Sequence, residues 1–461
     1  MSRSAALFWV LTALVLGIIV WLTQPRPVLQ SASVQLLPDF SPSQVSQIEI
    51  EWPDGERARL DRAPFDPYWI LLSQPKDNAR TPPWPAETGR VQGLLRLLAE
   101  AREGGDARAM PTALFLTLSR GSGSPIRLAV DPNPLGGTGS IARLGADGRV
   151  AAVAEVDEQF VRALAWSAID SWRSKDLLFW PTAATTELRS RSGSATFDVV
   201  KAGGAWIMRD PIAIKADAAG VEGALLLLSK SAVDRFLPPN ATPEDAWASP
   251  ARVIHFAAKV PGTRDHLEIE QAMELGTLID SNSRMVRITA RQSGESAALW
   301  GPEIAIVNEA TLRAIPTDAG MFVSRISLDL PPADIASVEI RFSGRRAVVE
   351  RDSSGKFGEA DPPVRELLRL LCETPSSGTR ILDAPPPPSD EFVEVRVFGP
   401  KSDPLASFLL RVGSIPSRVS GAPSVPAIEI VYRAISRTVP WQRPGDFLAT
   451  LRGLTSNTQQ R

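Results

Sequence analysis

A short apolar phrase occurs three times along this chain of 461 residues. Its copies are the segments 91–98 (VQGLLRLL), 221–228 (VEGALLLL) and 364–371 (VRELLRLL). In each copy, apolar residues stand at the first, fourth, fifth and eighth positions, a spacing that places them on one side of an α-helix. The phrase therefore predicts three amphipathic helices and a chain built from three related units.

Each phrase follows a run of alternating apolar and polar residues broken by turn signals, which predicts strands. Trp69, Trp206 and Phe357 stand at equivalent places ahead of the three phrases, and each is expected to close a small three-stranded meander over its helix. These aromatics are roughly 140–150 residues apart, which suits small domains rather than a solenoid. Further strands are expected after each helix. The predicted class is α+β, with three repeats that each hold small antiparallel sheets and an amphipathic helix.

The expected boundaries place repeat 1 at residues 34–172, repeat 2 at 173–322 and repeat 3 at 323–453. A polar tail is expected at 454–461. A length of about 150 residues for each repeat is typical of single domains.

An uncharged apolar stretch, residues 5–23, precedes the first repeat. As a helix it would rise about 28 Å, close to the hydrocarbon thickness of a bilayer. It predicts a single-pass transmembrane anchor, with residues 1–4 as a cytoplasmic tip and 24–33 as a linker. A cleaved signal peptide is the alternative, although its apolar core is usually only about 7–15 residues long. Because Arg3 precedes the stretch and only Arg26 closely follows it, the body is expected on the exported side.

Charge and cysteine content exclude some classes of function. The formal net charge is -2, so the chain has no overall positive field that would attract nucleic acid. Its one cysteine, Cys372, excludes an internal disulfide. Because Cys372 ends the third helix phrase, it is interpreted as a small buried residue rather than a reactive thiol.

The two histidines do not predict a metal site. His255 and His266 flank a predicted hairpin turn at residues 262–263. In that register His266 would face Lys259, with His255 four positions further along, about 13 Å away at strand rise. This separation is too long for the two side chains to share one metal ion.

No other pattern predicts catalysis. The segment 137–142 (GTGSIA) matches a dinucleotide-binding fingerprint in letters only, because a hairpin turn rather than a helix follows it. Glu268, Glu270 and Glu274 could serve as acids or bases, but alternation assigns Glu268 and Glu270 to the solvated face of a strand. No Walker A sequence is present. The chain is therefore expected to be no enzyme, with no cofactor, no metal and no identifiable binding residues.

The order of these features resembles a bacterial family of unknown function, usually called DUF-forty-three-forty. The resemblance rests on Leu36-Leu37-Pro38, the strand 45–50, an aromatic followed by proline, and the helix phrase. It covers most of the chain after Val34 and departs from the family at Phe357, which replaces tryptophan. The family implies anchored extracytoplasmic proteins, some of which accompany gliding-motility-type ABC transporters, and it supplies no catalytic residues.

Together these features predict a non-enzymatic protein of the bacterial inner membrane with its bulk in the periplasm. It is expected to be an accessory or substrate-engaging component of an ABC-type transport complex. The expected partners are the membrane and the permease and ATPase subunits, and nucleic acid is not expected. The alternative is an envelope scaffold that binds proteins or glycans without a transporter. An extracytoplasmic enzyme is the third hypothesis.

Overall fold

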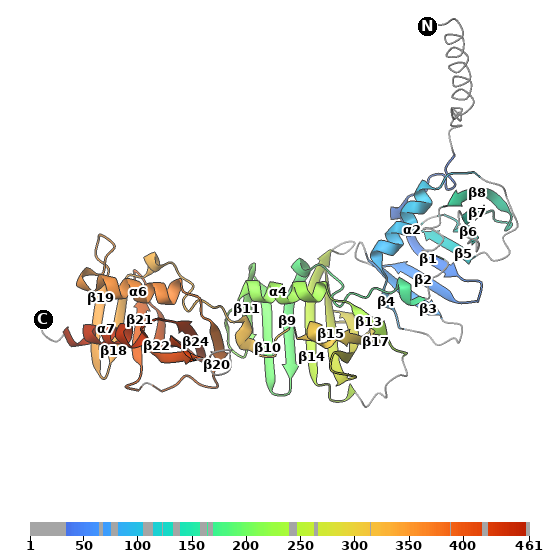
Figure 1. The fold of residues 1–461 in the computed structure, drawn as a ribbon. Helices are drawn as coiled ribbons and strands as arrows, with labels where there is room; N and C mark the ends of the chain where they lie inside the picture. The colour runs from blue at the N-terminus through green and yellow to red at the C-terminus, as the bar shows by residue number, and fades with distance from the viewer. Residues whose placement is uncertain are drawn as a thin grey trace, which may run out of the picture. The chain divides into compact units, whose positions relative to one another are not determined.

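The structure is a computed structural model in which strands dominate (Figure 1). It describes residues 34–63, 68–74, 82–104, 114–121, 123–131, 139–156, 164, 169–238, 247–261, 266–313, 315–387, 389–416 and 423–457. Of these residues 48% lie in strands and 21% in helices. The predicted α+β class is therefore wrong, because the protein is mainly β, with three large antiparallel sheets in place of small ones.

The first sheet is an antiparallel array in the order β3-β2-β1-β5-β6-β7-β8. Its strands are β1 (Val45–Glu51), β2 (Arg57–Arg62), β3 (Trp69–Gln74), β5 (Leu114–Arg120), β6 (Ile126–Asp131), β7 (Gly139–Leu144) and β8 (Val150–Val156). Its helix is α2 (Thr88–Glu100), and the 3-10 turns η1 (Pro42–Gln44) and η2 (Ile169–Trp172) accompany it. The segment that resembled a dinucleotide fingerprint enters β7, as expected for a hairpin.

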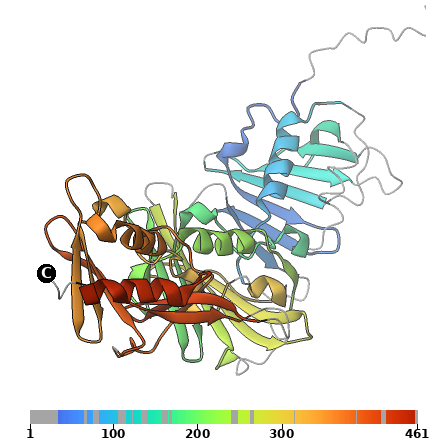
Figure 2. The ribbon, with the colours of Figure 1, turned by 60° about the vertical axis from the view of Figure 1, so that its left-hand side comes forward.

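The second sheet has nine strands in the order β12-β11-β10-β9-β14-β15-β16-β17-β13. They are β9 (Thr185–Ser192), β10 (Ala195–Ala202), β11 (Ala205–Asp210), β12 (Ile214–Lys215), β13 (Val233–Phe236), β14 (Arg252–Pro261), β15 (His266–Leu278), β16 (Ser283–Gln292) and β17 (Ala298–Asn308). Helix α4 (Ala218–Ser229) lies across one face of this sheet, and α5 (Glu309–Leu312) follows β17 (Figures 1 and 2). The 3-10 turns η3 (Thr182–Ala184) and η5 (Ala319–Phe322) complete this part of the chain.

The third sheet has seven strands in the order β19-β18-β21-β22-β23-β24-β20. They are β18 (Ser337–Phe342), β19 (Arg345–Glu350), β20 (Gly378–Ile381), β21 (Val393–Phe398), β22 (Pro404–Ile415), β23 (Val425–Tyr432) and β24 (Ile435–Pro440). Two helices, α6 (Asp361–Cys372) and α7 (Pro444–Asn457), accompany this sheet, and η6 (Pro332–Asp334) and η7 (Gly358–Ala360) precede α6. Because α7 reaches Asn457, the predicted polar tail begins inside a helix.

All three sheets share one chain path. The first strand of each sheet pairs with the first long strand after the helix: β1 with β5, β9 with β14, and β18 with β21. The helix is therefore a connection within one continuous sheet and does not separate two small sheets. This long-range pairing is the physical reason for the mainly β class.

A cation stacked on the equivalent aromatic residue occurs in every sheet. Arg62 lies 5.2 Å from the ring centre of Trp69, and Arg351 lies 4.8 Å from that of Phe357. Lys201 takes the same role on Trp206 at 5.6 Å. Such cation–π contacts contribute about 0.5–1 kcal/mol at exposed sites and more when desolvated.

The two arginines of these pairs are also anchored to equivalent backbone positions. Arg62 donates to the Pro42 carbonyl in η1, and Arg351 donates to the Pro332 carbonyl in η6. The expected three-stranded meander is wrong for the third repeat, because β19 is followed by a turn and then by η7, which Phe357 directly precedes. Phe357 is nevertheless buried, so the aromatic keeps its core position without a third strand.

The three helix phrases form helices that bury the predicted stripe. The buried positions are Val91, Leu94, Leu95 and Leu98 in α2, Val221, Ala224, Leu225 and Leu228 in α4, and Val364, Leu367, Leu368 and Leu371 in α6. Asp217 caps α4, because its side chain accepts a hydrogen bond from the Ala219 amide. The repeated helix was thus predicted correctly.

The predicted anchor does not appear in the described structure. Residues 1–4, 5–23 and 24–33, predicted as tip, transmembrane helix and linker, lie outside the described residues. None of the helices in the described ranges is long and apolar enough to cross a bilayer. The expectation of a single-pass fold built on a transmembrane helix is therefore wrong for the described residues, which form antiparallel sheets.

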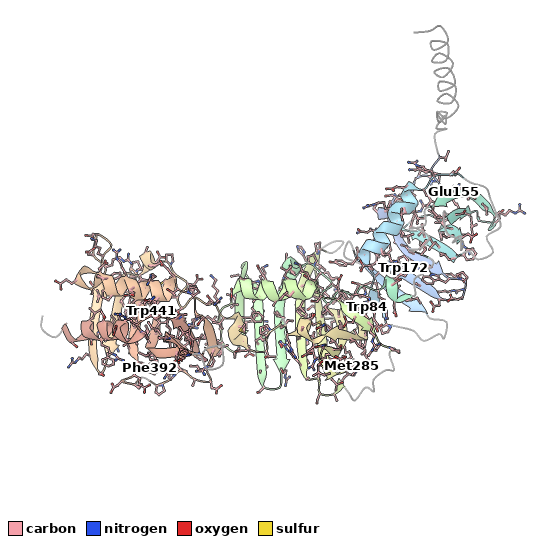
Figure 3. All side chains as sticks on the ribbon, viewed as in Figure 1. Trp84, Glu155, Trp172, Met285, Phe392 and Trp441 are labelled. Carbon is pink, nitrogen blue, oxygen red and sulfur yellow. The ribbon has the colours of Figure 1, made fainter. Side chains whose placement is uncertain are left out.

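The chain divides into two compact units. The first comprises Met1–Arg62, Tyr68–Thr81 and Ala86–Arg173, and the second comprises Ala63–Pro67, Pro82–Pro85 and Ser174–Arg461. The second unit therefore includes the short strand β4 (Trp84–Pro85). Trp84, labelled in Figure 3, is fully buried there. Its ring makes edge-on contacts with Phe179 at 5.1 Å and with Phe236 at 5.3 Å.

Candidate interaction site

Helix α4 exposes apolar side chains at two positions where a surface helix usually carries polar ones. Leu226 is 47% exposed and Leu227 is 56% exposed. At the position of Leu226, the other two helix phrases carry arginines, Arg96 and Arg369. Exposure of leucine to water does not stabilise a helix. Contiguous exposed apolar residues therefore mark contact surfaces. We name the residues Glu222, Gly223, Leu226, Leu227 and Lys230 the α4 face.

In the third sheet, the equivalent positions of helix α6 are covered by other parts of the chain. Leu370, the equivalent of Leu227, is fully buried in one hydrophobic cluster with Phe447, Leu448 and Leu451 of α7. Arg369, the equivalent of Leu226, lies 5.7 Å from the ring centre of Trp441, which precedes α7 (Figure 3). This part of α6 is therefore a packing surface within the chain.

Among the described residues, the second sheet has no helix as long as α7 to cover the equivalent part of α4. α5 holds four residues, whereas α7 holds fourteen. Leu312 of α5 is buried, yet Leu226 and Leu227 of α4 stay exposed. The α4 face is thus a helix surface whose equivalent is covered in the third sheet and open in the second.

Charged and small residues flank the two leucines. Glu222 and Lys230 are both exposed and stand one on each side along the helix. The Trp206 indole donates to the Glu222 carboxylate at 3.4 Å, which holds that side chain toward the start of the helix. A Cβ atom added at Gly223 would meet no other atom within 4 Å, so the surface beside the leucines is open.

The apolar surface extends past the first turn of α4. Met321 of η5 is 65% exposed. Its carbonyl oxygen lies 3.6 Å from the place where a Cβ atom of Gly220 would stand. Gly220 lies seven residues before Leu227, on the same side of the helix. Met321 therefore lies close to the line of the α4 face, and methionine is a flexible residue often found at binding surfaces.

A cavity of about 480 Å³ lies near the α4 face. Its lining includes Arg252, Arg284, Glu309, Arg313, Asp318 and Met321. Arg252 is 6% exposed, and its guanidinium donates to Ser190 Oγ and to the Ile315 and Pro316 carbonyls, each at 2.7 Å. Burial lowers the pKa of Arg252 to about 10, and the Glu309 carboxylate opposes this shift. Arg284 donates to Glu309 at 2.6 Å and to the Gly276 carbonyl at 2.7 Å.

These contacts assign the arginines of the cavity a structural role. The donors of Arg252 tie β14 to β9 and to the segment that leads from α5 toward η5. The pKa of the Glu309 carboxyl is lowered by the hydrogen bond from Arg284, so this carboxyl stays ionised and is a poor proton donor. These hydrogen bonds hold the segments around the cavity in place beside the α4 face.

Replacing Arg252 with methionine tests this role. The change leaves the Ser190 hydroxyl and two buried carbonyls without their donor while it keeps most of the side-chain volume. We expect the free energy of unfolding of the second unit to fall by about 2–3 kcal/mol. Hydrogen exchange of peptides from β14 and β9 measures this change, with Arg313→Met, at an exposed arginine of the same cavity, as the control. A loss no larger than that of the control would contradict the structural role.

The two histidines lie on neighbouring strands but far apart. His266 pairs with Pro261, and Lys259 pairs with Glu268, so the predicted register of His266 opposite Lys259 is wrong. The pairing stops at Pro261 and His266, and residues 262–265 between them lie outside the described residues. His255 pairs with Ala272, about 20 Å from the hairpin end at strand rise. No cluster of potential metal ligands occurs among the described residues.

His255 is expected to make folding sensitive to mild acid. Burial lowers its pKa below 6.5, as do Arg189 and Arg291, while Glu270 and Glu274 oppose the shift. Because the unfolded state takes up the proton first, stability is retained above about pH 6.5 and falls as the pH drops through the folded pKa. Hydrogen exchange of β14 peptides at two pH values, corrected for the intrinsic rate at each pH, should show a smaller loss of stability for His255→Gln than for the wild type. An equal loss in both would contradict this effect.

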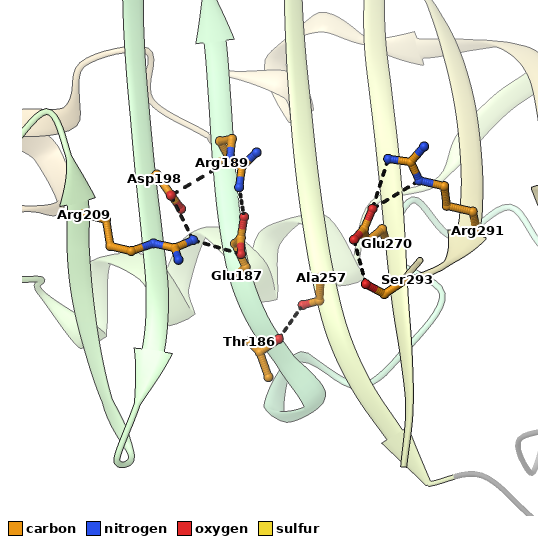
Figure 4. Close-up of polar contacts among 9 residues, drawn as sticks. All are labelled: Thr186, Glu187, Arg189, Asp198, Arg209, Ala257, Glu270, Arg291 and Ser293. Carbon is orange, nitrogen blue, oxygen red and sulfur yellow. Dashed lines mark hydrogen bonds and ion pairs between the residues drawn. The ribbon is translucent and has the colours of Figure 1, made fainter. Parts of the chain in front are cut away.

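The three glutamates of β15 make cross-strand ion pairs. Glu268 pairs with Lys259 at 2.9 Å, and Glu270 pairs with Arg291 at 3.1 Å. Glu274 pairs with Arg287. Figure 4 shows the Glu270 pair beside a second group, in which Arg209 contacts Glu187 at 3.1 Å and Asp198 at 2.9 Å. The assignment of Glu268 and Glu270 to the solvated face is confirmed.

Cys372 ends α6, as the sequence predicted, and is partly buried against the hydrophobic cluster of the third sheet. Burial raises the pKa of the Cys372 thiol to about 11, and the Glu373 carboxylate adds to this shift. The thiol is therefore protonated at neutral pH, which is the inert form.

Comparisons with known proteins return no relative. No protein-family model matches this chain, and neither a curated protein nor a solved structure matches it. The resemblance drawn from the sequence thus stays an inference from the quoted residues. Sequence reasoning missed the α4 face because it treated all three phrases as core. The signal was the leucine at position 226, where the other two phrases carry Arg96 and Arg369.

Proposed function

We propose that this chain is a non-enzymatic protein-binding component of an ABC-type transport complex, and that the α4 face is its binding surface. The observation that carries the proposal is the exposure of Leu226 and Leu227 on a helix whose equivalents carry arginine or are covered. Exposed apolar residues grouped on one helix favour docking of another protein.

The type of complex rests on the sequence. The resemblance to the DUF-forty-three-forty family favours a place in the bacterial periplasm beside a gliding-motility-type transporter. The sequence holds no Walker A motif, so a separate subunit would supply ATP hydrolysis. The permease and the ATPase are therefore the partners we propose, and the proposal does not depend on residues 5–23.

Affinity capture with three variants tests the proposal. Wild type, Leu226→Arg and Val412→Arg are each tagged, crosslinked in cells of the source organism and identified with their partners by mass spectrometry. Leu226→Arg introduces the residue that α2 and α6 carry at this position, so the fold should tolerate it. Val412 is 54% exposed on β22 and provides the same chemical change elsewhere.

We expect wild type and Val412→Arg to capture an ABC permease with its ATPase, and Leu226→Arg to lose them. Capture of other envelope proteins in place of transporter subunits would reject the transporter role and favour the scaffold alternative. Equal capture by all three variants would reject the α4 face as the binding surface.

A further inference from the structure

We propose that the α4 face pairs with the α4 face of a second copy of this chain, antiparallel about a two-fold axis at Leu226. This inference rests on the proposed function only in taking the α4 face as a binding surface. It adds a second partner for that face, the chain itself, which binds in place of a transporter subunit while the pair lasts.

The positions of the charges carry the inference. Glu222 lies four residues before Leu226, and Lys230 lies four residues after it. In an antiparallel pair centred on Leu226, each Glu222 therefore stands opposite the Lys230 of the other copy. A two-fold contact is self-complementary by definition, and this arrangement forms two identical ion pairs around one apolar centre.

The helix geometry brings the same residues to one side. Four residues correspond to about 6 Å along the axis and slightly more than one full turn. Glu222, Leu226 and Lys230 therefore share one face, with Leu227 beside them and Gly223 one turn before it. The open space at Gly223 would let the two helices approach to the usual 8–10 Å between axes.

The surroundings of α4 explain why a second copy suits this site. The α4 face is apolar at the centre and charged at both ends, with opposite signs. A partner face needs the reverse order of charge, and the antiparallel α4 helix has that order. A helix of twelve residues is about 18 Å long, so the contact is smaller than a standard interface and should be weak and reversible.

Sedimentation velocity of the full-length chain tests the pairing. The protein is measured in a non-ionic detergent over a concentration series up to about 200 μM, where a contact of this size should be detectable. We expect reversible dimers for wild type and Val412→Arg. Leu226→Arg should raise the dissociation constant at least about tenfold, because it places two guanidinium groups at the centre of the pair.

Charge exchange tests the register. Glu222→Lys alone and Lys230→Glu alone should each weaken the homodimer, because like charges then face one another. An equimolar mixture of the two variants should restore dimers, since lysines at both positions then face glutamates at both positions. Glu222→Lys/Lys230→Glu in one chain should also dimerise.

Two results would overturn the inference. One is a wild-type chain that stays monomeric over the whole series, and the other is a mixture of the single variants that fails to form heterodimers. If the wild type is monomeric while capture of transporter subunits still depends on Leu226, the inference fails and the proposed function stands. If dimers form as expected while capture is independent of Leu226, the proposed function fails and the pairing stands.

Discussion

Leu225→Asp is expected to lower the free energy of unfolding of the second unit by about 4–5 kcal/mol. Leu225 is fully buried at the centre of the stripe that α4 presents to its sheet. A carboxylate at this position either stays charged without a partner or takes up a proton, and both outcomes oppose folding. The loss approaches the whole stability of an ordinary domain, so partial unfolding is expected.

The same substitution one residue further along is the matched control. Leu226→Asp changes an exposed position and should alter stability by no more than about 0.5 kcal/mol. Hydrogen exchange of peptides from α4 and β9 is the suitable measurement, because a chain with several cooperative units has no single unfolding transition. Equal protection of α4 in both variants would mean that Leu225 does not face the core.

Trp84→Ala should lower the free energy of unfolding of the second unit by about 3–5 kcal/mol. Trp84 is fully buried between aromatic rings of this unit, and its indole donates to the Ser174 carbonyl at 2.8 Å. The alanine removes both the ring contacts and this donor. Protection of β13 and β17 against hydrogen exchange should fall with it.

Trp84→Phe is the smaller change. Phenylalanine keeps an aromatic ring among Phe179 and Phe236, and it removes the donor to Ser174 together with one ring of the indole. The expected loss is about 1–2 kcal/mol, clearly smaller than that of alanine. Unchanged protection of β13 and β17 in Trp84→Ala would contradict the assignment of this short segment to the core of the second unit.

The helices of this protein were predictable because their signal is local. The spacing in 91–98, 221–228 and 364–371 fixes which residues face the core, and the structure buries those residues. The equivalence of Trp69, Trp206 and Phe357 was also predicted from the sequence, and the structure buries all three. The cations that stack on them were not predicted, because the contacts of Arg62 and Arg351 depend on backbone geometry that a sequence does not display.

The sheets were underestimated because their pairing is not local. β1 pairs with β5 across the whole of α2, and β9 pairs with β14 across α4. A sequence shows where strands lie but not that they join across a helix. The long hairpin of β16 and β17 is the strand pair expected at the end of the second repeat, but its residues were not assigned from the sequence.

The candidate site could be predicted only in part from the sequence. The departure of Leu226 from arginine is visible in the three phrases, but its meaning depends on what covers each helix. In the third sheet α7 buries the equivalent of Leu227, and in the second the short α5 leaves Leu227 exposed. The same sequence pattern can therefore give a buried helix face or an exposed contact surface. The two can be told apart only when the positions of the neighbouring elements are known.

A photo-crosslinking amino acid at position 226 tests the central claim most directly. With the α4 face as a binding surface, irradiation of living cells should give protein adducts at position 226 and not at the equally exposed position 412. The expected adducts are with α4 peptides of a second copy or with transporter subunits, which would cover the same leucines and therefore bind in turn. An absence of protein adducts at position 226, in a chain that folds and is produced normally, would contradict the claim.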